Sequence, residues 1–308
     1  MRVAAIDLGT NTTRLLVADV ADGRVDEVVR RSEITRLGEG VDERRRLLPV
    51  PIARVRNVLS TYRREAESLG AERTLLVATS AVRDAENGEA FLGEIEWSYG
   101  FSTRLVSGDE EAGLTLRGIA TGRELEQGTL VVDIGGGSTE LVCDDVRTSV
   151  DVGAVRLTER FLHADPPTEQ ELESCAAGVR ASLPLLEPER AVGVAGTITT
   201  LGALDLELDE YDPDRVDGHR LSRAGAERQL RRLAELPLEQ RRNVPALEPK
   251  RAPVIVAGAV ILVEVLARYD LEAIEVSERD ILDGVALEAD ALPEPAEGEA
   301  PPGAYTCC

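Results

Sequence analysis

Lysine is almost absent from this chain, because Lys250 is the only one among 308 residues. It does not follow a glycine-rich loop, so the Gly-Lys-Ser/Thr motif of P-loop proteins is missing. The two histidines and four cysteines show no metal-ligand spacing, which argues against zinc sites, a disulfide framework and a Ser-His-Asp triad. Aromatic residues make up only 3% of the chain, so its cores must be built from aliphatic side chains.

Long apolar runs are also missing. No run approaches the roughly 20 residues that cross a bilayer, and Asp7 interrupts the first apolar stretch, unlike in a secretory leader. We therefore expect a cytoplasmic protein without a membrane partner. The net charge of −22 argues against nucleic-acid binding. A polyanion could still bind where arginine, backbone N–H groups or a metal make one cleft positive.

What the chain does contain is a repeat of its own N-terminal segment. Residues 4–17 resemble residues 130–143 at an offset of 126. Both read as an apolar strand, Asp, an apolar residue, Gly, small or polar residues, Thr and a second apolar strand. One such hairpin could arise by chance, but two that each open a domain-sized stretch indicate duplication.

The residue types in the hairpin indicate a site for a metal ion or an anion. An Asp at the end of a buried strand can hold a divalent metal or orient water, and the adjacent Gly leaves N–H groups open to an anion. The alternative is a plain hairpin in which Gly forms the turn and Asp caps it.

Strand and helix patterns follow each hairpin in a similar order. Apolar periodicity predicts helices at 52–69, 89–99 and 110–120 in the first half, with strands between them. The expected fold class is α/β: duplicated actin-like (ribonuclease H-like, ASKHA) domains with a central interdomain cleft. We expect domain I over residues 1–128, domain II over 129–291 and a disordered tail over 292–308, which is rich in Pro, Glu and Gly.

Several further motifs resemble the exopolyphosphatase and guanosine pentaphosphate phosphatase (Ppx/GppA) family. The resemblance covers residues 1 to about 290 and corresponds to a short, two-domain form. Its marks are Ala-Ile-Asp-Leu-Gly-Thr-Asn-Thr at 5–12, Thr-Ser-Ala-Val-Arg at 79–83, Gly-Asp-Glu-Glu-Ala at 108–112, Asp-Ile-Gly-Gly-Gly-Ser-Thr-Glu at 133–140 and Gly-Ala-Val-Arg-Leu-Thr-Glu at 153–159.

The resemblance implies that Glu111 is the base that activates the attacking water. Without it, the pair Glu110–Glu111 could equally serve the dipole of a helix N-terminus. Arg83 is the expected phosphate-binding cation, since a guanidinium can bind two oxygens at once. A surface ion pair with Asp84 or Glu86 is the alternative for this arginine.

A divalent cation, Mg²⁺ by the resemblance, is assigned to Asp133 and Glu140 with Asp7 nearby. The alternative is a turn Asp and an exposed strand Glu. The expected phosphate-binding residues lie in three loops and are Gly9, Thr10, Asn11, Thr12, Gly135, Gly136, Gly137, Ser138, Thr139, Gly196 and Thr197.

The function that follows is an exopolyphosphatase, a phosphoanhydride hydrolase that removes terminal phosphates from inorganic polyphosphate by metal-assisted water attack. Within the same chemistry, guanosine pentaphosphate is the rival substrate, although scarce aromatics disfavour a base-stacking pocket. Functions of two different classes stay open as well: an actin-like kinase or ATPase, and a non-hydrolytic sensor that binds polyphosphate or a nucleotide. The short chain also suggests a preference for short polyphosphates, and the sequence leaves a homodimer open.

Overall fold

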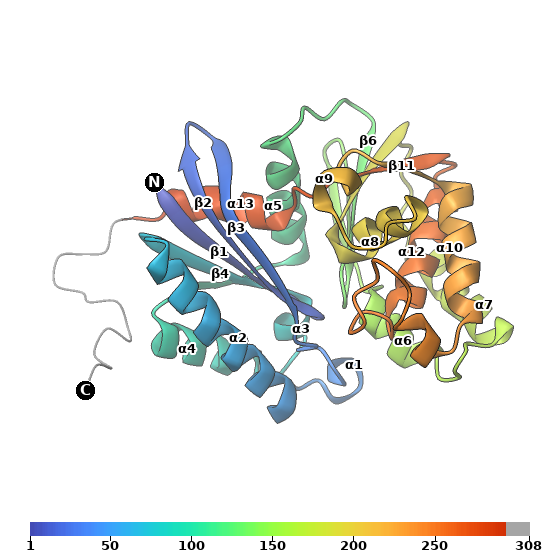
Figure 1. Ribbon diagram of the computed structural model, residues 1–308, viewed down its shortest axis with the longest axis horizontal. Coiled ribbons are helices and arrows are strands. Elements are labelled where there is room, and N and C mark those ends of the chain that lie inside the picture. Colours follow the sequence, from blue (N-terminus) through green and yellow to red (C-terminus); the bar gives the residue numbers. More distant parts are fainter. Residues whose placement is uncertain (294–308) are drawn as a thin grey trace. The chain divides into compact units, whose positions relative to one another are not determined.

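The computed structural model describes residues 1–293. The expected disordered tail therefore lies outside the described residues from position 294 onward. The chain divides into two compact units (Figure 1). Unit 1 contains residues 1–123 and the C-terminal segment that starts at Arg279, and unit 2 contains residues 124–278.

Unit 1 is built on a five-stranded sheet in the order β3-β2-β1-β4-β5. The first three strands form an antiparallel meander, and β4 and β5 continue the sheet in parallel with β1. The strands are β1 (Arg2–Leu8), β2 (Thr12–Ala21), β3 (Arg24–Ile34), β4 (Arg73–Ala78) and β5 (Ser102–Leu105).

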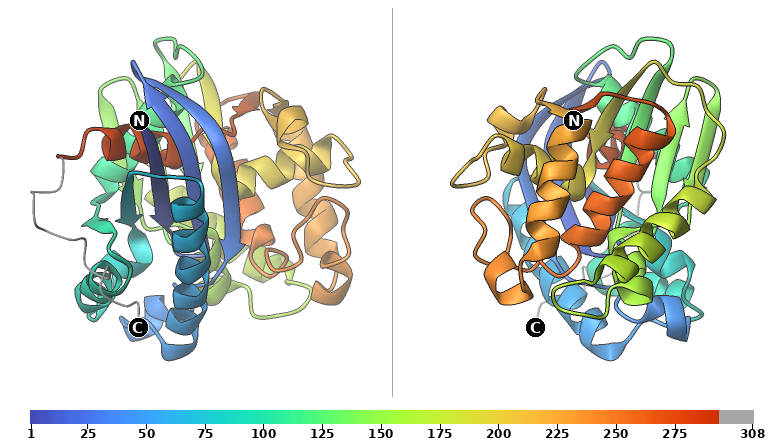
Figure 2. Two further views of the ribbon diagram at one scale, coloured as in Figure 1. Left: turned by 60° about the vertical axis from the view of Figure 1, so that its left-hand side comes forward. Right: turned by 90° about the vertical axis from the view of Figure 1, so that its right-hand side faces the viewer.

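Helices cover both faces of this sheet. Alternate residues of β1 point to opposite sides and are buried against different helices. Ala4 and Ile6 pack with α2 (Pro49–Ser68) and α4 (Gly88–Tyr99). Val3 and Ala5 pack with α5 (Gly108–Ala120) and α13 (Ile281–Asp290). Figure 2 shows α2 running along one face of the blue strands. The short helices α1 (Val41–Arg44) and α3 (Ser80–Arg83) follow strands of this unit.

Unit 2 is built on a six-stranded sheet in the order β10-β11-β9-β6-β7-β8. Its strands β8, β7, β6, β9 and β11 repeat the order and directions of β3, β2, β1, β4 and β5. The strands are β6 (Thr129–Ile134), β7 (Thr139–Cys143), β8 (Val146–Val150), β9 (Arg190–Val194), β10 (Arg220–Ser222) and β11 (Ala273–Val276).

The core of unit 2 is centred on α12 (Ile255–Arg268). This helix is apolar on most of its circumference and almost wholly buried, as expected of a helix inside a core. Leu130, Val132 and Ile134 of β6 contribute to the same core, so Val131 and Asp133 point to the other face of the sheet. The remaining helices are α6 (Ala154–Phe161), α7 (Glu169–Ser182), α8 (Ala195–Asp205), α9 (Pro213–Val216), α10 (Arg223–Glu235) and α11 (Leu238–Arg241).

The two hairpins confirm the repeat residue by residue. Asp7 lies opposite Arg14 in the first hairpin, and Asp133 lies opposite Glu140 in the second, which is the same register at the offset of 126. The turns also match, since Gly9 N donates to Thr12 O at 3.0 Å and the equivalent pair, Gly135 and Ser138, repeats this bond at 3.0 Å.

The expected domain limits need two corrections. Domain II was expected to end at residue 291, but α13 packs against β1 and α5 and thus completes unit 1. Its apolar residues Leu282 and Val285 cover the sheet face that α2 leaves open. The boundary between domain I and domain II was expected after residue 128, and in the structure it lies after residue 123. Sequence order hid this arrangement, because α13 directly follows the last strand of unit 2.

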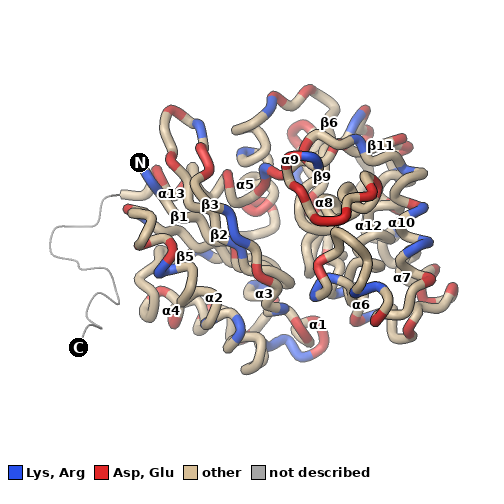
Figure 3. The backbone as a smooth tube through the Cα atoms, in the orientation of Figure 1, with Lys and Arg blue, Asp and Glu red and all other residues tan. Residues whose placement is uncertain are grey.

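Charge is spread widely over the surface. Acidic residues outnumber basic ones by 57 to 35, and Figure 3 shows the two kinds interspersed along α7 and α10. Among residues 1–293, every helix is too short or too polar to cross a bilayer.

The capping box at the start of α7 predicts that the stability of the protein decreases at low pH. Glu171 accepts hydrogen bonds from the N–H groups of Thr168, Ala164 and His163 at 2.8–2.9 Å, which lowers the pKa of its carboxyl from 4.5 to about 2. A lowered folded-state pKa stabilises the protein above pH 4.5, and this contribution is lost as the pH falls towards 2. We expect Glu171→Gln to lower the unfolding midpoint at about pH 7, and the difference from the unchanged protein to shrink between about pH 5 and pH 2. A difference independent of pH in thermal unfolding would contradict this.

Candidate active site

The loop after β1 presents the first group of expected phosphate ligands. Thr10 and Asn11 are buried, and their carbonyl groups are held by the segment that follows β3. Thr35 N and Arg36 N both donate to Asn11 O, at 3.0 and 2.9 Å, and Gly38 N donates to Thr10 O at 2.8 Å. Glycine is needed at position 38, because a Cβ there would lie 2.2 Å from the Thr10 methyl group.

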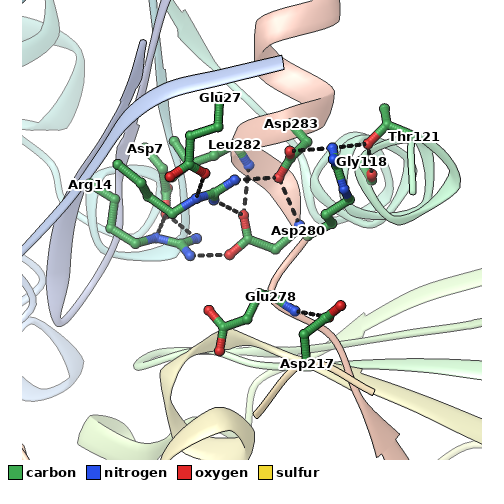
Figure 4. Close-up of polar contacts among 12 residues, drawn as sticks. Asp7, Arg14, Glu27, Gly118, Thr121, Asp217, Glu278, Asp280, Leu282 and Asp283 are labelled. Atoms are coloured by element: carbon green, nitrogen blue, oxygen red, sulfur yellow. Dashed lines mark hydrogen bonds and ion pairs between the residues drawn. The ribbon is translucent and has the colours of Figure 1, made fainter. Parts of the chain in front are cut away.

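Asp7, at the end of β1, belongs to a buried ion-pair network (Figure 4). Its carboxylate accepts from Arg14 Nη2 at 2.7 Å and from Arg14 Nε at 3.0 Å. Arg14 also pairs with Asp280, which caps α13 and lies 3.5 Å from Arg30. Arg30 continues the network to Asp283 at 2.9 Å.

Burial and the neighbouring arginines shift the pKa values of Asp7 and Asp280 in opposite directions. Burial raises the pKa of Asp7 above its ordinary value, and Arg14 counteracts part of that rise. Burial also acts to raise the pKa of Asp280, but Arg14 and Arg30 together bring it below its ordinary value. Asp7 therefore forms an ion pair with Arg14 within unit 1. Its role as a metal ligand stays a prediction.

Arg83 and Glu111 are brought together inside unit 1. Arg83 Nη1, at the end of α3, donates to Val106 O at 2.7 Å and to Glu111 Oε2 at 3.3 Å. Glu111 lies in the first turns of α5 and is only 8% exposed. A guanidinium beside a buried carboxylate gives one group that can bind phosphate oxygens and one that can accept a proton.

The structure also separates Glu110 from Glu111. Ser107 and Glu110 form a capping box at the start of α5, with Ser107 N donating to Glu110 Oε2 at 2.8 Å. The same bonds lower the pKa of Glu110. Glu110 therefore has the helix-terminal role that the sequence also allowed for Glu111, whose carboxylate instead faces Arg83.

In unit 2, the glycine-rich loop after β6 is held by the start of α6. Gly135 O accepts from Ala154 N at 3.0 Å, and Gly136 O accepts from Val155 N at 2.8 Å. This is the same kind of bracing by the segment after the third strand that unit 1 shows. Ser138 and Thr139 are buried at the end of the loop.

Asp133 and Glu140 face each other across β6 and β7 in unit 2. They are cross-strand partners, 6% and 2% exposed, so the alternative of an exposed strand glutamate is wrong. Ser149 donates to Glu140 Oε1 at 2.7 Å. Among the residues that the structure describes, no three acidic, His or Cys side chains gather as a metal site. Two carboxylates fit Mg²⁺, which usually binds one or two carboxylates together with water and substrate phosphate.

The third expected phosphate loop joins β9 to α8. Gly196 and Thr197 form the first turn of α8, and Thr197 is buried against Gly258 of α12. The guanidinium of Arg251 lies over Gly196, where an added Cβ would be 2.4 Å from its Nη atoms. The loop therefore combines a helix N-terminus with a nearby cation.

Comparison with known proteins decides the family. A model of the Ppx/GppA phosphatase family matches residues 16–291. The chain belongs to this family. The resemblance read from the sequence is confirmed, together with the actin-like α/β fold.

Two enzymes with different activities in their names, and one solved structure, are similar to this chain. Exopolyphosphatase 2 of Mycobacterium tuberculosis is 40% identical, and the alignment covers 93% of this chain and 98% of that protein. The guanosine-5'-triphosphate,3'-diphosphate pyrophosphatase of Vibrio vulnificus is 29% identical over 92% of this chain and 58% of that protein. The solved structure of the Aquifex aeolicus Ppx/GppA enzyme is 33% identical, with a TM-score of 0.79 and coverage of 94% and 99%.

Two arginines that the sequence did not assign lie beside the loops of this Ppx/GppA protein. Arg156 contacts the loop of residues 135–138, and Arg251 covers Gly196. Both stand in or next to segments already noticed in the sequence, but neither spacing nor residue type reveals which loop an arginine will reach. That information comes from the packing of α6 and of the segment before α12.

Ala195 gives a prediction about the third loop. It adopts φ +66°, a left-handed conformation that costs a non-glycine residue about 1–2 kcal/mol. Glycine removes that strain but loses about 0.5–1 kcal/mol through its greater freedom in the unfolded chain. We expect Ala195→Gly to be neutral or to stabilise the protein by up to about 1.5 kcal/mol in denaturant unfolding. A clear loss of stability would show that this conformation is not strained.

Proposed function

We propose that this chain is an exopolyphosphatase, which releases terminal phosphates from inorganic polyphosphate. The observation that carries the proposal is the contact between Arg83 and the buried Glu111 carboxylate at 3.3 Å. The likeness to the Mycobacterium tuberculosis exopolyphosphatase over nearly the full length of both proteins supports the substrate class.

The reaction is hydrolysis of a phosphoanhydride. A water oxygen attacks the terminal phosphorus while Glu111 accepts a proton from that water. The anhydride P–O bond between the terminal phosphate and the rest of the polyphosphate breaks. In unit 1, Arg83 and the polar groups of residues 10–12 would bind phosphate oxygens. In unit 2, the N–H groups of residues 136–138 would do so, and both sets offset the phosphate charge. Gly196 and Thr197 would bind a further phosphate at the start of α8.

Asp133 and Glu140 would hold the divalent cation. When bound, Mg²⁺ neutralises phosphate charge and helps to orient the substrate. The equivalent pair in unit 1 is Asp7 with Arg14, where the arginine already balances the carboxylate. This difference between the repeats favours unit 2 as the place of the metal.

Phosphate release tests the proposal. The purified chain would be given short polyphosphate, long polyphosphate, guanosine pentaphosphate and ATP, each with and without Mg²⁺. We expect metal-dependent release from polyphosphate. Preferred release from guanosine pentaphosphate would support the rival substrate, and hydrolysis of ATP alone would favour an actin-like ATPase. Tight polyphosphate binding without turnover would indicate a sensor.

A further inference from the structure

We call the loop of residues 135–138 the glycine loop. Its first three carbonyl groups all accept hydrogen bonds from α6. Gly135 O and Gly136 O accept from the first N–H groups of α6, including Arg156 N at 3.1 Å. Gly137 O accepts from the Arg156 side chain, whose Nε lies 2.6 Å away. Arg156 is 6% exposed, so its head group is fixed beneath the loop.

Fixing these carbonyls also fixes the N–H groups of the loop. In a trans peptide, the N–H points opposite to the C=O of the same plane. The peptide planes of the three bound carbonyls carry the N–H groups of Gly136, Gly137 and Ser138. Within residues 1–293, these three N–H groups donate to no other group of the chain. They therefore point together, away from α6, as donors for an anion.

The glycine at position 153 makes this bracing sterically feasible. A Cβ on Gly153 would lie 2.5 Å from the carbonyl carbon of Gly136 and from that of Gly137. The start of α6 can thus approach the loop closely enough for its N–H groups to bond. In unit 1, backbone N–H groups from residues 35–38 bind Thr10 O and Asn11 O, which correspond to the carbonyls of Gly136 and Gly137, and the arginine side chain is an addition of unit 2.

We propose that Arg156 is a positioning residue for phosphate binding: by holding the Gly137 carbonyl, it aims the Ser138 N–H and the neighbouring donors of the glycine loop at a phosphate group of the substrate. The role rests on the proposed function, since it concerns the same bound phosphates. In this role Arg156 acts on the substrate through the loop.

The test compares three variants. Arg156→Met keeps an unbranched apolar stem but removes the guanidinium that donates to Gly137 O, and Arg156→Lys keeps a charged donor on a stem of similar length. Tyr269→Phe is the control, because it removes a single side-chain bond to another main-chain carbonyl of unit 2, from the Tyr269 hydroxyl to Pro184 O at 3.1 Å. For each variant, kcat and KM for tripolyphosphate and the thermal unfolding midpoint would be measured.

Binding would be measured separately from turnover. Calorimetric titration with tripolyphosphate in a Glu111→Gln background reports the affinity of the loops without hydrolysis. We expect Arg156→Met to weaken binding roughly tenfold or more and to lower kcat by up to about 100-fold, since a misplacement near 1 Å can have that effect. Arg156→Lys should recover part of both losses. Tyr269→Phe should lower the unfolding midpoint and leave kcat and affinity unchanged.

The measurements distinguish a failure of the positioning role from a failure of the proposed function. If the unaltered chain releases phosphate while Arg156→Met keeps its kcat and affinity and only unfolds at a lower temperature, the positioning role is overturned and the exopolyphosphatase stands. If the unaltered chain neither binds nor hydrolyses tripolyphosphate, the proposed function fails, and the positioning role falls with it.

Discussion

Replacing Glu111 by glutamine should lower kcat for phosphate release from polyphosphate by about 10²- to 10⁴-fold, the contribution usual for a general base. Glutamine has almost the same shape, and its amide cannot accept the proton of the attacking water. Polyphosphate affinity should change little, because Arg83 and the loop N–H groups remain. Initial-rate measurements and calorimetric binding would separate the two effects.

Glu110→Gln is the matched control for this variant. The two residues are adjacent, carry the same charge and lie in the same turn of α5, but Glu110 is exposed and caps the helix. Its replacement should cost about 1 kcal/mol or less of stability and leave kcat unchanged. Equal losses of activity in both variants would assign the effect to the helix terminus, and an active Glu111→Gln protein would remove Glu111 from the catalytic role.

Placing a methyl group on Gly284 should destabilise the protein by about 1–3 kcal/mol, because it overpacks a close helix contact. Gly284 of α13 lies against α5, where an added Cβ would be 2.1 Å from Leu114 O. Gly118 of α5 makes the reciprocal approach, with an added Cβ 1.7 Å from Asp280 O. A backbone oxygen cannot turn aside as a side chain can, so the helices must move apart.

Gly93→Ala provides a control of opposite sign. Gly93 is exposed in the middle of α4, and nothing lies within 4 Å of the place where its Cβ would be. Alanine there should stabilise the protein by about 0.5–1 kcal/mol. Denaturant unfolding of both variants tests whether α13 belongs to unit 1. An unchanged midpoint for Gly284→Ala would mean that the α5–α13 contact is not close.

The repeats have diverged at one position that bears on their chemistry. Arg14 and Glu140 occupy equivalent places opposite the Asp that both hairpins share, and they carry opposite charges. The first hairpin thus contains an internally balanced pair, while the second brings two carboxylates to one face. The two copies of the turn therefore differ in charge at this position, and the pair of carboxylates in the second copy is the one to which we propose that the divalent cation binds.

The sequence by itself determined the fold class, the repeat and the hairpins. These features depend on local patterns, because alternation defines strands, helical periodicity defines α2 and α5, and the turn after Asp7 and Asp133 uses residues about four positions apart or fewer. The family resemblance added Glu111 in preference to Glu110, a choice that spacing alone left open.

Only the tertiary structure decided which distant residues meet. Arg83 and Glu111 are 28 positions apart and meet because α3 and α5 follow adjacent parallel strands. Asp280 reaches Arg14 across 266 positions because α13 returns to the first unit. Such contacts depend on which face of a sheet a helix covers, and burial of apolar surface decides that face for the whole unit together. No local pattern in α13 or α6 contains that information.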